Sequence, residues 1–184
     1  MEIHMNKLEI EKQLEETHSR FIKLANSIPE ENYPLPTDNP AWTVGDILFH
    51  ITLGPRALAL EVWMTIHFNG LYNFLMRHFP SSLFNSVNAW FGRGQSKRIS
   101  RQGLLKAYGK AHAAIKSRLR RTREEDLGKI AIYPLDYVSD LKGEVSVERL
   151  FLYVAGHFEE HERALKIGSL PPFSAEGGKG DSLV

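Results

Sequence analysis

Two histidines near the end of the chain have a spacing that suits metal binding. His157 and His161 are four residues apart, in a segment where Tyr153, Val154 and Leu165 recur with helical periodicity. On a helix this spacing places both imidazoles on one face, about one turn apart and within reach of a single ion. Two adjacent buried imidazoles without an ion would compete for hydrogen-bond partners. The pair therefore predicts part of a divalent-metal site.

A third histidine, His50, lies on the apolar face of an earlier predicted helix. Three inward histidines on two helices suit a facial metal site with positions open to water or substrate. The alternative is that each is a hydrogen-bonded histidine of the core or of an interface. Three imidazoles accept zinc, nickel, iron and copper alike, so they do not select the metal. His4, His67 and His78 lie in polar or irregular stretches, and we expect them at the surface or at an interface.

The sequence identifies no catalytic residue, but three polar residues are candidates. Asp46 precedes His50 by one turn and could orient its ring, although a helix-capping role also explains it. Glu160 adjoins His161 in sequence but points about 100° away around the helix. We expect it at the rim of the site, with general base as a lesser alternative. His112 lies at the edge of the inner face of a third helix, where packing is a simpler role than lining the pocket.

Two further polar residues lie close to predicted core faces. His18 follows Leu14 by four residues and, like His112, is expected at the edge of the core. Glu61 lies three turns after His50 on roughly the same face of its helix. Its carboxylate is therefore expected to be buried or paired with an arginine.

Four long segments with helical periodicity must position these side chains. The first has apolar residues at positions 14, 21, 24 and 28 and is stopped by Pro29. The third can be capped by Ser100, and the last begins at Ser146. Four long helices predict an all-α protein with a bundle fold.

The second helix has the clearest start. Thr43 and Asp46 form a capping-box-like pair at its beginning. Pro55 lies inside the same segment, where a proline removes one backbone hydrogen bond and usually kinks a helix. We expect a bend just past His50.

Three other stretches are less regular. Residues 71–94 are rich in Phe, Leu and Trp and predict one or two short helices, packed as a lid or as a subunit contact. Residues 130–138 predict a short extended connection. Residues 171–184 begin with two prolines and are rich in glycine, which predicts a flexible C-terminal tail after a single domain of residues 1–170.

The composition argues against several classes of protein. The 23 Lys and Arg residues nearly cancel 22 Asp and Glu, a balance that argues against nucleic-acid binding through phosphate neutralisation. The arginines at 118–123 are followed by three acidic residues and are interpreted as a solvated helix end. The absence of cysteine excludes disulfides, thiolate zinc sites and cysteine nucleophiles.

No signal-peptide pattern is present, and the apolar stretch 63–91 is too interrupted to span a bilayer. We expect a cytoplasmic protein with no membrane partner.

Two motifs resemble those of the DinB/YfiT-like metalloenzymes. Residues 42–51, WTVGDILFHI, resemble the second-helix motif of that family, and residues 146–161 resemble its last helix. The resemblance covers most of the chain in order and is weakest over residues 67–98. It implies a four-helix bundle with a long crossover connection, here with an extra helical insertion between the second and third helices. It also implies that His50, His157 and His161 bind one divalent ion, usually nickel or zinc, in a protein that is often a homodimer.

The resemblance favours a thiol-dependent S-transferase, because characterised relatives include thiol-dependent transferases and isomerases. A low-molecular-weight thiol would then be the cosubstrate, and a small-molecule substrate would occupy a pocket over the metal. Hydrolysis by metal-activated water is the alternative chemistry. Two non-enzymatic alternatives stay open: a metal-binding stress or interaction protein, and a helical module without metal that binds a partner through residues 71–91. The fold alone does not decide between them.

Overall fold

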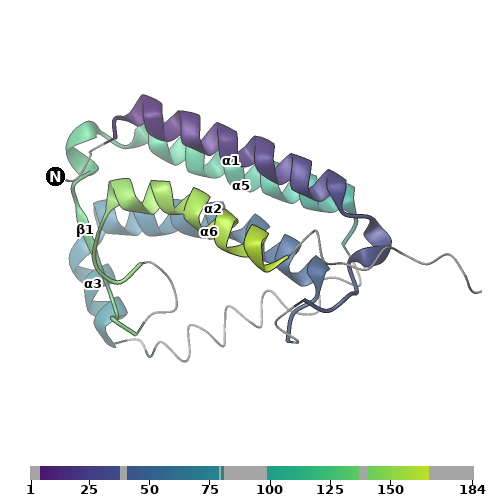
Figure 1. The fold of residues 1–184 in the computed structure, drawn as a ribbon. Coiled ribbons are helices and arrows are strands. Elements are labelled where there is room, and N and C mark those ends of the chain that lie inside the picture. Colours follow the sequence, from purple (N-terminus) through teal and green to yellow (C-terminus); the bar gives the residue numbers. More distant parts are fainter. Residues whose placement is uncertain (1–4, 38–40, 79, 81–98, 137–140, 166–184) are drawn as a thin grey trace, which may run out of the picture.

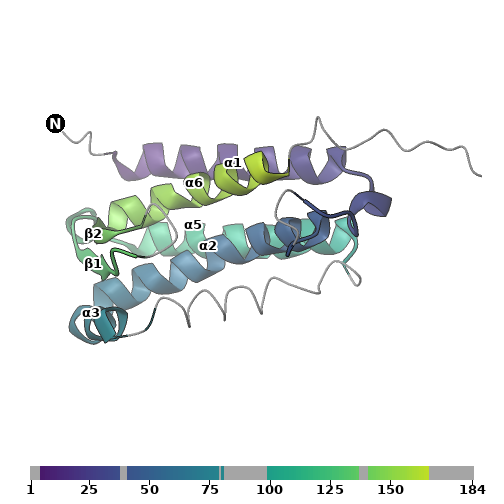
Figure 2. The same ribbon diagram turned by 60° about the horizontal axis from the view of Figure 1, so that its bottom comes forward.

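The computed structural model describes residues 5–37, 41–78, 80, 99–136 and 141–165. Its body is a bundle of four long helices (Figure 1), namely α1 (Lys7–Ser27), α2 (Val44–His67), α5 (Arg101–Arg121) and α6 (Val147–Ala164). Each helix packs against two others, so that the order around the bundle is α1, α5, α2, α6. Figure 1 shows α1 beside α5, and the turned view in Figure 2 shows α1 beside α6. The predicted helical bundle is confirmed.

The long helices begin at residues whose side chains cap their first backbone N–H groups. Thr43 accepts a hydrogen bond from Asp46 N at 3.2 Å, and the Asp46 carboxylate accepts one from Thr43 N, which completes the predicted capping box. Ser100 and Ser146 cap α5 and α6 as predicted. Helix α1 begins with a capping box on Asn6 that the sequence analysis did not identify. These caps satisfy donors that have no partner within a helix.

The core consists of two groups of buried apolar side chains, one toward each end of the bundle. The first includes Leu58 and Val154, and the second includes Ile51 and Phe158. His157 lies between Val154 and Phe158 along α6. The histidines on α2 and α6 therefore lie near the place where the two groups meet.

Helix α2 is the most apolar of the long helices. It continues through Pro55 to His67. Among the described residues it is the one helix long and apolar enough to cross a membrane, because its most apolar 18-residue stretch has a mean hydropathy of 1.2. Half of that stretch is buried inside the bundle. A helix that is apolar around much of its circumference is typical of a buried position in a core.

The predicted insertion between the second and third long helices is present as α3 (Asn69–His78). Its Tyr72 is buried, whereas Leu71, Phe74 and Leu75 are exposed. Residue 79 and residues 81–98, for which a further short helix was expected, lie outside the described residues, as does the predicted tail at 171–184.

A small antiparallel hairpin joins α5 to α6. Strand β1 (Ile130–Tyr133) pairs with β2 (Gly143–Ser146), with Ile130 opposite Ser146 and Tyr133 opposite Gly143. Two single-turn 3-10 helices, η1 (Glu30–Asn32) and η2 (Glu124–Asp126), follow α1 and α5. The extended segment at 130–133 was predicted, but its partner strand was not. The hairpin is thus a small addition to an otherwise helical fold.

Candidate metal centre

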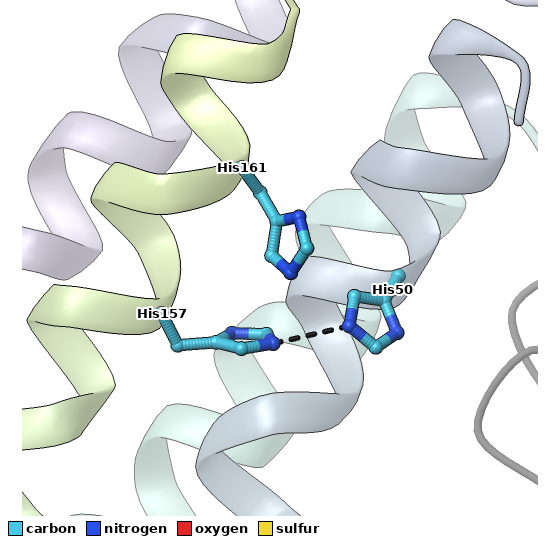
Figure 3. A group of neighbouring side chains, drawn as sticks. All are labelled: His50, His157 and His161. Carbon is cyan, nitrogen blue, oxygen red and sulfur yellow. Dashed lines mark hydrogen bonds between the residues drawn. The ribbon is translucent and has the colours of Figure 1, made fainter. Parts of the chain in front are cut away.

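Three imidazoles from two helices converge inside the bundle. His50 extends from α2 toward α6, and His157 and His161 extend from successive turns of α6 toward α2 (Figure 3). One ring nitrogen of each residue lies within 4.8 Å of those of the other two. The ring centroids are 5.0 Å apart for His50 and His157, 4.7 Å for His50 and His161, and 4.6 Å for His157 and His161. The structure therefore brings together the three histidines selected from the sequence.

The distance between two of the nitrogens suits a shared ion. His50 Nε2 and His157 Nε2 are 3.1 Å apart (Figure 3). Zinc–imidazole bonds are about 2.0–2.1 Å long, so two nitrogens at this separation would subtend an angle of about 100° at one ion. Two neutral imidazole nitrogens that face each other can hold at most one hydrogen between them. With the ring of His161 beside them, they form an electron-rich group that fits a cation.

Burial keeps all three rings in the form that coordinates metal. It lowers the pKa of His50 to about 3, with a smaller effect from the charge of His161, and lowers the pKa of His161 to about 4. Burial also holds the pKa of His157 well below its usual value, and the charges of the other two rings act in the same direction. The imidazoles are therefore neutral at pH 7, and only neutral imidazole has a free lone pair on nitrogen.

The position of His157 depends on a glycine of the opposite helix. Gly54 lies four residues after His50 on α2, and so shares its face. A Cβ atom at Gly54 would lie 2.7 Å from His157 Nδ1 and 2.9 Å from its Cε1. Both distances are shorter than any ordinary contact, so a side chain there would displace the ring. In the sequence, Pro55 signals a kink and Gly54 has no evident role; a glycine one turn from a predicted ligand was the available clue.

A comparison of the sequence with models of protein families identifies the family of this chain. The chain matches the sequence model of the DinB superfamily over residues 13–164, a range that includes all three. This protein belongs to the DinB superfamily.

Solved structures show the same fold. The DinB-superfamily chain superposes on the mycothiol-dependent maleylpyruvate isomerase with a TM-score of 0.63, at 12% sequence identity over 88% of this chain. A histidine-to-alanine mutant of that isomerase gives a TM-score of 0.63 at 11% identity, also over 88% of this chain. In both cases this chain spans 61% of the other protein. The comparison with curated proteins gave no match.

The other candidate residues of this DinB-superfamily protein lie in different surroundings. Asp46 is buried and accepts the hydrogen bond of the α2 capping box. Nδ1 of His50 has no hydrogen-bond partner in the described part of the chain, so Asp46 does not orient that ring through it. Glu160 is exposed on α6. His112 is buried but belongs to a separate cluster with Glu15 and His18, between α1 and α5.

No fourth histidine or carboxylate completes the three-histidine group within the described ranges. His157 and His161 are each partly exposed, whereas His50 is buried. Two aromatic rings lie beside it: Trp42, edge-on to His50 with 5.4 Å between centroids, and Tyr153, 6.1 Å from His157. An ion held by three histidines alone would keep a coordination position for a ligand that the protein itself does not provide.

Glu61 has other partners than the arginine considered for it. Its carboxylate accepts a hydrogen bond from the hydroxyl of Tyr133 on β1, and that hydroxyl lies 3.2 Å from the hydroxyl of Tyr72 on α3. Burial raises the pKa of the Glu61 carboxyl, and the hydrogen bond from Tyr133 partly opposes that change. Glu61 is thus half-buried, and its partner is a phenol and not an arginine.

Proposed function

We propose that this protein is a metal-dependent enzyme that transfers or adds a low-molecular-weight thiol to a small electrophilic substrate. The observation that supports this most directly is the convergence of three neutral imidazoles from two helices, two of them partly exposed. A divalent ion on three neutral ligands keeps its full charge and lowers the pKa of a thiol or water molecule bound to it.

The residues of the site would have three different roles: binding the ion, leaving space for a ligand, and excluding water. His50, His157 and His161 would hold the ion, and Gly54 gives His157 the space to reach it. The rings of Trp42 and Tyr153 would form apolar walls that keep water from the reacting atoms. Holding both reactants beside one another supplies much of the rate gain in such reactions.

The choice of a thiol rests on two points. The fold matches a mycothiol-dependent isomerase, although at an identity that supports the fold alone. The chain contains no cysteine, so any thiol in its chemistry must be a separate molecule. A free thiol has a pKa of about 8.5, and binding to a cation increases the thiolate fraction at pH 7.

The direct test is an activity screen on the metal-loaded protein. Mycothiol, bacillithiol, glutathione and coenzyme A would each be offered with electrophilic acceptors, maleylpyruvate among them, and thiol consumption or isomerisation followed. We expect turnover with at least one thiol, and its loss in the His50→Ala/His161→Ala variant. His67→Ala, at an exposed histidine remote from the site, is the matched control and should keep wild-type activity. Turnover without any thiol, or none with all four while metal is bound, would contradict the proposal.

A further inference from the structure

A second cluster of metal-ligating side chains lies between α1 and α5. Glu15 and His18 are three residues apart and so share a face of α1, and His112 lies opposite them on α5. One ligand atom of each lies within 4.8 Å of those of the other two. Helices α1 and α5 form the side of the bundle opposite α2 and α6 (Figure 1), so this cluster is separate from the three-histidine site.

His112 is the buried member of the cluster. Its side chain is 8% exposed, and its Nε2 is buried without a hydrogen-bond partner in the part of the chain that the structure describes. The nearby backbone of Leu14 raises the pKa of the ring, but less than burial lowers it. With its hydrogen on Nδ1, the neutral ring has a lone pair on Nε2, the buried nitrogen without a partner.

This lone pair faces other electron-rich atoms. Oε2 of Glu15 is 3.9 Å from Nε2 of His112. The ring of His18 stacks on that of His112, with 4.2 Å between centroids and 7° between planes. Burial lowers the pKa of His112 despite the neighbouring carboxylate, so the ring is predominantly neutral at pH 7. A buried lone pair beside a carboxylate oxygen is stabilised by a cation between them.

Lys116 is the cation already present nearby. Its ammonium group bonds to Oε1 of Glu15 and lies 3.3 Å from Oε1 of Glu11. It thus occupies the oxygen of Glu15 that faces away from His112, and part of its charge is balanced by Glu11. Oε2 of Glu15 is left to face the two imidazoles.

We propose that Glu15, His18 and His112 form a second divalent-metal site, for an ion such as Zn²⁺ that accepts both imidazole and carboxylate ligands. Parallel rings direct their lone pairs along parallel lines, so binding requires His18, the more exposed of the two, to tilt toward the ion. A bound ion would link α1 to α5 and satisfy Nε2 of His112. This proposal does not depend on the proposed function.

The test counts zinc ions in the full chain. Titration calorimetry with Zn²⁺, and elemental analysis after gel filtration, should give two equivalents for wild type and one for His50→Ala/His161→Ala. Adding His18→Ala to that variant should weaken the remaining site by at least about tenfold, since loss of even an outer-shell partner costs that much. His18 is chosen because it is partly exposed, so its removal spares the core.

Two controls, a neighbouring variant and a measurement of helix content, separate loss of a ligand from loss of structure. Glu15→Gln should weaken the second site, whereas Glu16→Gln, at an exposed neighbour outside the cluster, should not. Circular dichroism should show the same helix content in every variant. The proposal is overturned if His50→Ala/His161→Ala binds no zinc, or binds one ion that His18→Ala does not weaken. Loss of zinc through His18→Ala alone, with no effect of His50→Ala/His161→Ala, would instead support the second site and contradict the proposed function.

Discussion

Gly54 shows how one residue without a side chain can make space for an imidazole of another helix. The imidazole of His157 lies against the backbone of α2 at this position, where a Cβ atom would be 2.7 Å from its Nδ1. Glycine suits the position for a second reason, because it precedes Pro55. A Cβ on the residue before a proline disfavours the helical conformation. Both constraints act on the same turn of α2, immediately after His50.

We therefore predict that Gly54→Ala weakens metal binding. The methyl group would move the ring of His157 away from His50, and the resulting misplacement should reduce affinity about ten- to a hundredfold, the range for lost support of a ligand. Calorimetric titration of the apo protein with Zn²⁺ measures the change at the three-histidine site, with His18→Ala in the background to remove the second proposed site.

Gly109→Ala is the matched control. Gly109 lies within α5, and no atom lies within 4 Å of a Cβ built there. Alanine is favoured over glycine in a helix by about 1 kcal/mol, so this variant should be equally or more stable and should bind metal as wild type does. Equal affinity of Gly54→Ala and wild type would show that the ring of His157 is not held by this contact. Denaturant unfolding of the apo variants separates a general loss of stability from the effect on the site.

Among the elements, α2, α3 and the hairpin are joined by a chain of polar groups at one end of the bundle. Tyr72 of α3 and Tyr133 of β1 lie with their hydroxyls 3.2 Å apart, and Tyr133 donates to the Glu61 carboxylate of α2. Asn73 of α3 also accepts a hydrogen bond from Ile132 N of β1 at 2.9 Å. These bonds attach the insertion and the hairpin to the bundle by specific contacts.

The raised pKa of the Glu61 carboxyl predicts a dependence of stability on pH. An acid whose pKa is higher in the folded state contributes stability that is fully present below its unfolded value of 4.5 and is lost as the pH rises through the folded value. Glu61→Gln keeps an acceptor for Tyr133 and has no charge. Relative to wild type, this variant should therefore gain stability as the pH is raised from 4.5 to 8.

Urea unfolding of both proteins at several pH values measures this difference. Glu16→Gln, at an exposed residue of α1, is the control and should show little change with pH relative to wild type. A difference between Glu61→Gln and wild type that stays constant from pH 4.5 to 8 would mean that Glu61 is not held in a desolvated state.

At the scale of the whole molecule, the features that depend on local sequence were predictable. Thr43, Ser100 and Ser146 cap helices because their side chains bond to the backbone N–H three residues away, and the local sequence contains all the necessary information. His157 and His161 share a face by helical geometry alone. The convergence of His50 with them followed from the apolar face of α2 and from the resemblance to a known family.

Features that depend on contacts between distant segments could not be predicted from the local sequence. The space that Gly54 leaves for His157, the pairing of β1 with β2 and the phenol partner of Glu61 each join residues ten or more positions apart. Strand β2 has only four residues and ends at the residue that caps α6, so it gives little periodic signal. The homodimer, the cytoplasmic location, the identity of the metal and the domain limit at residue 170 stay predictions.

The most direct test of the central claim is the metal content of variants that lack one histidine each. In the His18→Ala background, elemental analysis of the purified, zinc-loaded protein should give one ion per chain. His50→Ala, His157→Ala and His161→Ala should each reduce this value to near zero while circular dichroism shows a folded bundle. Equal zinc content in all four proteins would contradict the assignment of these imidazoles as the ligands of one ion.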